Sequence, residues 1–273
     1  MQIAILDRWQ RQALTAGKHY MTTMKKFIST LILTVSCLTI FAQYKMRTVD
    51  QLINRTDPGW TVVEQWIDSA KNKVQVLPVD TVKAKDALYK TQVTTRSIMG
   101  AIVFSTGGIL VDNGWIRILG SGSSEMQRTL PDWNKGKAFK EFGDRPAFFL
   151  VADDAAGGFF AINYGSFGKD IDNIYYLSPD DLKWEALGMN YEDFIWFCFT
   201  GNLEEFYKGI RWNSWQKDIG TLKADEVFHI MPPLWSKEGK DVEKSLKKAV
   251  PVEENFYYTL QLRKTMGLDK DGY

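Results

Sequence analysis

The sequence predicts one α+β domain, in which helices pack on an antiparallel or mixed sheet built from hairpins. Three observations lead to this fold class. Turn signals separate short apolar runs around Asn113-Gly114 and around residues 178–181, which is typical of β-hairpins. Helical segments with capping residues lie apart from these runs rather than alternating regularly with them. The chain has 273 residues, is 45% hydrophobic and contains no internal repeat, which suits a single core.

The N-terminal region has the layout of a secretory signal peptide. Lys25 and Lys26 form a basic start, and residues 27–41 are an uncharged, mostly apolar run that is shorter than an ordinary membrane span. Ala42 is the small residue at the end of this run, where cleavage is expected. We therefore predict that residues 24–42 are a signal peptide and that the protein is exported to the periplasm or secreted.

This interpretation sets the expected domain boundaries. A signal peptide starts at or near the true start of translation, so we expect Met24 to be the initiator and residues 1–23 to be a misassigned extension. The alternatives are a retained membrane anchor or a lipoprotein acylated at Cys37. The mature chain is then one domain over residues 44–266 with a short tail at 267–273, and we expect it to have no stable membrane span.

The first part of this domain is expected to contain three helix starts and one short strand. Thr48 and Gln51 match a capping box. Asp57 followed by Pro58 indicates a second helix start, with the aspartate as the cap. The run "KVQVLPV" is typical of a strand, and Asp80 is expected to cap the helix that follows it.

The clearest hairpin signal is Asn113-Gly114, in "GGILVDNGWIRILG". These two residues tolerate the positive φ of a two-residue type I′ turn. The polar stretch after it is expected to be a loop. Backbone N–H groups of Gly120–Ser124 are a weak candidate anion site, because no Gly-Lys-Ser/Thr sequence follows them.

The stretch "VADDAAGGFFAINYG" carries the candidate acidic site. Asp153 and Asp154 precede Gly157 and Gly158 between two apolar runs, a composition that favours a structural turn between strands. In such a turn the glycines should matter more for stability than the aspartates. The alternative is a ligand or metal contact that uses Asp153, Asp154 and the polar Asn163, with Asp170 and Asp172 as further oxygen donors for calcium.

The second half of the domain is expected to contain a hairpin, two helices, a strand and a last helix. The hairpin turns at "SPDD", between residues 174–177 and 182–184. Asn190 is expected to cap one helix that ends at Gly201, and Asn202 to cap the next. A strand near residues 226–230 and an amphipathic segment at residues 251–266 complete the chain.

Residue counts exclude several classes of site. The expected mature chain has one cysteine, Cys198, and one histidine, His229. It can therefore form no intramolecular disulfide and no zinc site built from several histidines or cysteines. Cys198 lies among aromatic residues and is expected to be a buried, unreactive thiol. A Ser-His-Asp mechanism would depend on His229 alone. We predict no catalytic residue, metal or cofactor, and the near-neutral charge gives no reason to expect nucleic-acid binding.

The aromatic content is high, with ten tryptophans. Large rings usually belong to the core. If some are exposed, Trp133, Trp212 and Trp215 are candidates for stacking on a sugar. Of these three, we predict Trp133 and Trp212 as binding residues.

The stretch "VADDAAGGFFAINYGSFGKDIDNIYYLSPDDLKWEALGMNYEDFIWFCFTGNLEEFY" resembles a bacterial family described as domain of unknown function 2625. The runs "QVTTRSIMGAIVFSTGGILVDNGWIRILGSGS" and "LWSKEGKD" resemble the same family, over about residues 46–262. The central pattern is also distantly similar to the SMI1/KNR4-like (SUKH) domains. The corresponding segments are 149–152, Gly157-Gly158, 159–163, 173–177 and 191–199.

The resemblance to the SUKH domains implies an α+β protein that binds a partner and has no catalytic residues. We therefore expect an exported, non-catalytic binding module, in the manner of an immunity protein, whose partner is an unknown protein or glycan. Two alternatives stay open. One is a periplasmic hydrolase that uses carboxylates such as Asp153 or Asp154, because glycoside hydrolysis needs only two acids. The other is a carbohydrate-binding protein with exposed tryptophans.

Overall fold

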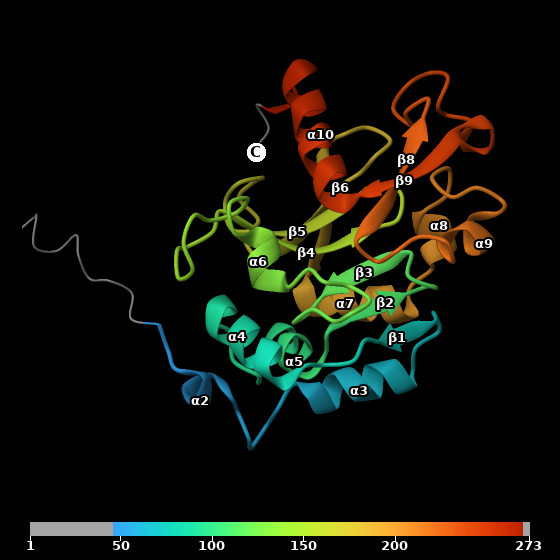
Figure 1. Cartoon of the computed structure of the whole chain (residues 1–273). Helices are drawn as coiled ribbons and strands as arrows, with labels where there is room; N and C mark the ends of the chain where they lie inside the picture. Colours follow the sequence, from blue (N-terminus) through green and yellow to red (C-terminus); the bar gives the residue numbers. More distant parts are fainter. Residues whose placement is uncertain (1–45, 270–273) are drawn as a thin grey trace, which may run out of the picture. The chain divides into compact units, whose positions relative to one another are not determined.

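The computed structural model describes residues 46–269 (Figure 1). The predicted extension at residues 1–23 and the predicted signal peptide at residues 24–42 lie outside the described residues. The helices are α2 (Val49–Leu52), α3 (Trp60–Asp68), α4 (Thr81–Thr91), α5 (Ile98–Ser105), α6 (Leu130–Asn134), α7 (Tyr191–Thr200), α8 (Leu203–Phe206), α9 (Trp215–Ile219) and α10 (Val252–Thr265), with a 3₁₀ turn at Val242–Lys244. The strands are β1 (Val74–Val76), β2 (Gly108–Val111), β3 (Ile116–Leu119), β4 (Phe148–Asp154), β5 (Phe159–Asn163), β6 (Asn173–Leu177), β7 (Trp184–Asn190), β8 (Glu226–Met231) and β9 (Leu246–Pro251).

The centre of the domain is a seven-stranded antiparallel sheet in the order β1-β2-β3-β4-β5-β6-β7. Neighbours in the sheet are therefore neighbours in the sequence, as expected for a series of hairpins. Strands β8 and β9 form a separate antiparallel ribbon (Figure 1). The prediction of a single α+β domain with hairpins and packed helices is confirmed.

Helices cover both faces of the sheet, as two adjacent residues of β5 show. Successive side chains of a strand point to opposite faces. Phe159 contacts Phe256 of α10, with ring centroids 5.0 Å apart, and Phe160 contacts Phe194 of α7 at 4.8 Å. Every residue of β4 and β5 is buried for this reason. A polar side chain on either strand consequently needs a partner inside the protein.

Helix boundaries follow the capping signals at most positions. The side chain of Asp80 accepts hydrogen bonds from the N–H groups of Val82 and Lys83, and Asn190 and Asn202 cap α7 and α8 in the same way. The predicted cap at Asp57 is wrong. Helix α3 starts at Trp60 with Gly59 as its N-cap, and the N–H of Gly59 donates to the carbonyl of Thr95 at 2.8 Å.

Both predicted hairpins form, but their turns differ from the predicted ones. Val111 pairs with Ile116, so residues 112–115 make a four-residue connection rather than a two-residue type I′ turn at Asn113-Gly114. Three successive residues, Asp112, Asn113 and Gly114, have positive φ. In the second hairpin β7 starts at Trp184, since Leu182 also has positive φ and cannot begin a strand.

Three helices, α5, α6 and α9, lie in segments where no helix is expected. Helix α5 is apolar on all sides and almost wholly buried, so it has no polar face to give a helical period. Its N-terminus is capped by Ser97. Helix α6 lies within the expected polar loop and starts after Thr129, whose side chain accepts from Asp132 N–H.

The helices of residues 46–269 are all too short or too polar to cross a bilayer.

Candidate functional site

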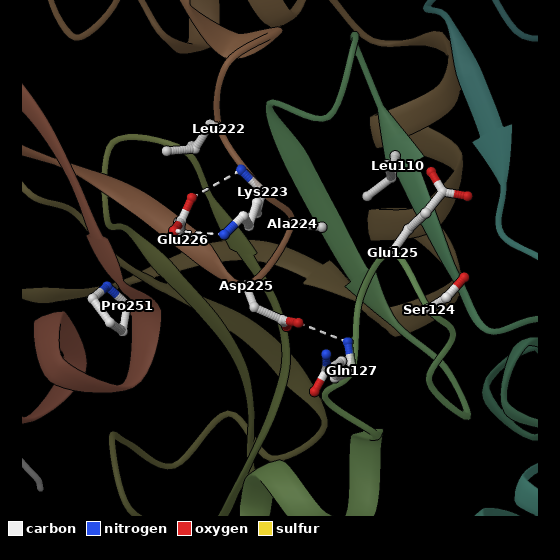
Figure 2. A pocket seen from close by; sticks show the side chains of 10 residues that line it. All are labelled: Leu110, Ser124, Glu125, Gln127, Leu222, Lys223, Ala224, Asp225, Glu226 and Pro251. Atoms are coloured by element: carbon white, nitrogen blue, oxygen red, sulfur yellow. Dashed lines mark hydrogen bonds and ion pairs between the residues drawn. The ribbon is translucent and has the colours of Figure 1, made fainter.

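Two adjoining cavities form a groove beside the β8–β9 ribbon. The first, of about 570 Å³, lies between the loop at residues 124–127, which follows β3, and residues 222–226, which lead into β8 (Figure 2). The second, of about 380 Å³, extends past α6 to the start of α10. Both cavities are lined by Gln127, Asp225 and Pro251. We call the two cavities together the groove; each has a volume typical of ligand sites.

The base of the groove is held by Asp225. Its Oδ2 accepts from the Gln127 N–H at 2.7 Å, the contact that crosses the first cavity in Figure 2. Its Oδ1 pairs with the Nε of Arg128 at 2.9 Å. Arg128 also donates to the carbonyl of Ala224 at 2.8 Å. These bonds join the two walls, which come from segments about a hundred residues apart, so the hollow is preorganised.

A chain of alternating charges connects this base with the interior of the sheet. Nη1 of Arg128 lies 2.5 Å from Oδ2 of Asp153, and Oδ1 of Asp153 lies 2.5 Å from Nη2 of Arg117. Arg117 and Asp153 are fully buried and directly opposite each other on β3 and β4. The carboxylate of Asp153 is therefore engaged by two guanidinium groups. Asp153 therefore anchors the wall of the groove. This role could not be predicted from the sequence.

Asp154 builds the turn that follows β4. Its Oδ1 accepts from the N–H groups of Ala156 and Gly158 at 2.9 and 3.0 Å, and its Oδ2 accepts from the Tyr176 hydroxyl at 2.7 Å. Burial raises the pKa of Asp154, and these hydrogen bonds offset the effect only in part. The group is sealed from solvent and offers no carboxylate to the groove.

The two glycines of this turn serve different purposes. Gly157 has a φ of +90°, which is costly for any residue with a Cβ. Gly158 has no positive φ, but a Cβ there would collide with Oδ2 of Asp154 and the ring of Tyr176. The expectation that the glycines matter more for stability than the aspartates stays a prediction for Asp154. For Asp153 the buried ion pairs with Arg117 and Arg128 lead us to expect a larger loss on substitution.

Asn163 holds the loop after β5 through four hydrogen bonds. Its amide donates to the carbonyls of Gly168 and Asp170 at 3.1 and 3.2 Å. Its carbonyl oxygen accepts from the N–H groups of Gly165 and Phe167. The side chain is fully buried and its hydrogen-bonding capacity is used within the loop. Its assignment as a ligand contact therefore finds no free polar atom in this structure.

The tryptophans expected to stack on a sugar are buried. Trp133 is 5% exposed and lies under the ammonium group of Lys137, 4.1 Å from the ring centroid. Trp212 is 2% exposed, and its Nε1 donates to Asp218 at 2.6 Å. Their assignment as exposed binding rings is wrong, because both belong to the core. Trp196 on α7, which is 42% exposed, is absent from the candidates because the apolar run around it hides which side faces outward.

The remaining candidates do not form a catalytic cluster in the part of the chain that the structure describes. Residues 46–269 contain no group of three His, Cys, Asp or Glu side chains arranged to hold a metal ion. Cys198 is fully buried, and burial raises the pKa of its thiol. His229 lies on β8 with its ring against Tyr258. The N–H groups of residues 121–123 donate to backbone carbonyls, which corrects the candidate anion site.

The family model described as "Protein of unknown function DUF2625" matches residues 49–255. This chain belongs to the DUF2625 family. It is 41% identical over 211 residues to an "Uncharacterized protein" of Haemophilus influenzae strain Rd, a match that covers 77% of this chain and 92% of that relative. It is 37% identical over 220 residues to "Putative uncharacterized protein YbfG" of Escherichia coli K12, covering 81% of this chain and 99% of that relative. The DUF2625 match covers the sheet, the groove and the Arg117–Asp153 pair.

Proposed function

We propose that this DUF2625 protein is an exported, non-catalytic binding module, and that the groove is its binding site. The observation that carries the proposal is the bracing of the groove by the Arg117–Asp153–Arg128–Asp225 chain. Four charged side chains connect a fully buried strand pair to the floor of an open hollow. Such a floor keeps its shape without a ligand, which lowers the entropic cost of binding one.

The two alternatives receive less support from the geometry. A carboxylate-dependent hydrolase would need an acid and a base that reach a substrate. Asp153 is neutralised by two arginines, and Asp154 is closed off behind Tyr176. A carbohydrate-binding protein would need exposed rings, whereas Trp133 and Trp212 are in the core.

The proposed location and role follow from the sequence. Export rests on the signal-peptide layout of residues 24–42. A role like that of an immunity protein, which neutralises a partner by binding it, rests on the distant similarity to SUKH domains. The antiparallel sheet with α7 packed on it is compatible with such a core.

Site-specific photo-crosslinking in cells tests the proposed binding site. A photoreactive amino acid replaces Ser124 on one wall of the groove, or Leu222 on the other, in protein expressed from the full sequence. The control carries it at Glu64, an exposed residue of α3. We expect one discrete adduct at both groove positions and none at the control. Adducts of equal yield at all three positions, or none, would refute the proposal.

A further inference from the structure

We propose that the ligand of the groove is an extended polypeptide segment that carries lysine or arginine side chains. This inference rests on the proposed function and specifies its ligand. It is carried by three features of the groove: the sign of its exposed charge, its apolar walls and its length.

The exposed charge of the groove is negative. Its carboxylates are Glu125, Asp132, Asp225, Glu226 and Glu253, and its cations are Arg128, Lys137 and Lys223. Two of the cations are withdrawn from solvent. The side chain of Lys137 is 3% exposed and pairs with Glu253 at 2.9 Å, and Arg128 is bound between Asp153 and Asp225. Glu253 itself is 61% exposed, and Asp132, which pairs with Lys90 at 3.1 Å, is 48% exposed against 23% for the lysine. In both ion pairs the carboxylate is therefore more exposed than the ammonium group, while Asp225 lies at the base.

Lys223, the remaining cation of the groove, does not neutralise its exposed negative charge. Its side chain is 81% exposed and lies 3.8 Å from Oε1 of Glu226, a long ion pair that contributes little at a solvated surface. The other oxygen of Glu226 accepts from the Lys223 N–H at 3.1 Å, which holds the carboxylate at the edge of the cavity. Glu125, on the opposite side of the first cavity, accepts only a long hydrogen bond from Gln75 at 3.3 Å. Figure 2 shows Glu125 and Glu226 on opposite sides of the hollow, so that a cationic side chain between them meets carboxylates from both walls.

The walls between these carboxylates are apolar. Leu110, Leu222, Ala224 and Pro251 line the first cavity. Lysine and arginine bury their aliphatic stems on such surfaces while the charged end reaches a polar rim. A groove with apolar sides and an acidic rim therefore matches these two side chains better than a small compact cation.

The length of the groove favours a chain. Two cavities continue into each other past Gln127, Asp225 and Pro251, and an extended polypeptide advances about 3.3 Å per residue along such a path. Trp133 is the aromatic ring in the lining and it is buried, so a sugar finds no stacking surface. The negative rim repels phosphate-bearing ligands, nucleic acids among them.

A titration with short homopeptides tests the ligand class. Fluorescently labelled lysine decapeptide is added to the purified protein at about 0.15 M salt, where charges more than about 8 Å away are screened, and binding is followed by anisotropy. The variant E125Q/E226Q removes one carboxylate from each wall. The matched control E64Q/E185Q removes two exposed carboxylates on α3 and β7, with the same change in net charge. We expect the groove variant to bind about tenfold more weakly, as two exposed charge pairs allow, and the control to change by less than about twofold.

Four results would overturn this inference. Equal weakening in both variants would mean that the peptide responds only to net charge. Tighter binding of a glutamate decapeptide would reverse the sign of the recognised charge. Binding of a glucosamine oligomer in place of the lysine peptide would make the ligand a cationic glycan. Crosslinks at Ser124 and Leu222 without binding of the lysine peptide would leave the groove as a binding site and reject the ligand class, whereas the loss of both would reject the proposed function.

Discussion

Replacing Asp153 with asparagine should destabilise this protein strongly. Asp153 pairs with Arg117 and with Arg128, each at 2.5 Å, and only Arg128 has a second carboxylate in Asp225. The substitution therefore removes the carboxylate that forms an ion pair with the guanidinium of Arg117 in a fully buried position. Removing one partner of a buried ion pair costs about 3–5 kcal/mol. For a domain of this size that corresponds to a melting temperature lower by roughly 6–20 °C.

The assay is thermal and urea unfolding of the wild type and of three variants. Asp154→Asn is the matched control, since it makes the same chemical change at the next buried residue. The amide oxygen of asparagine still accepts from Ala156 and Gly158 N–H, so we expect a loss of only about 1 kcal/mol. The double variant R117L/D153N removes the orphaned charge and should be more stable than Asp153→Asn alone.

Comparing Asp153→Asn with Asp154→Asn shows whether the loss of stability comes from the broken ion pair or from any substitution in this turn. Equal, small losses for Asp153→Asn and Asp154→Asn would refute the reasoning, because they would show that the charge chain contributes nothing specific. A double variant that is less stable than Asp153→Asn would refute it as well, since removal of the unpaired Arg117 charge should restore stability.

Four further outcomes are expected. Burial holds the pKa of Asp154 in the folded state above its ordinary value of 3.8, so the folded protein binds this proton more tightly than the unfolded chain does. As the pH rises from 3.8 through the raised pKa, the wild type should lose stability relative to Asp154→Asn. Unfolding free energies of the two proteins that change in parallel from about pH 3 to 8 would contradict this. Gly157→Val should cost about 1–2 kcal/mol in urea unfolding because of the positive φ, and a neutral result would mean that the turn adapts. Cys198→Ala should cost about 1–2 kcal/mol, at the low end for a buried side chain, and should leave crosslinking at the groove unchanged. Protein expressed from Met24 should be recovered from the envelope with its N-terminus near Gln43, and an uncleaved chain in the cytosol would contradict export.

The hairpins and most helix starts were predictable from the sequence because their signals are local. Asp80, Asn190 and Asn202 cap helices through bonds to N–H groups two or three residues away. The turn chemistry around Asn113 and Gly157 likewise acts over a few residues. The exact geometry of the first hairpin was not predictable, since its register depends on pairing along β2 and β3 as well as on the turn.

Burial of the polar and aromatic candidates was decided by the tertiary structure. Nothing near Asn163 in the sequence shows that the loop folds back on its amide. Trp133 and Trp212 have the same neighbours in the sequence whether they face solvent or the core, and the packing of α10 and β8 against them settles the matter. Helix α5 was not predicted because a helix that is buried on all sides has apolar residues all round and shows no amphipathic period in the sequence.

The sequence by itself determined the fold class, the two hairpins, the main helix caps and the burial expected of Cys198, each through composition or through hydrogen bonds between near neighbours. Only the tertiary structure decided that Arg117, Arg128, Asp153 and Asp225 form one chain of charges, and that the loop after β3 and the segment before β8 enclose a groove. The physical reason is distance along the chain. Ion pairs and cavities depend on which segments the packed core brings together, and no local propensity encodes a meeting between residues that lie a hundred positions apart.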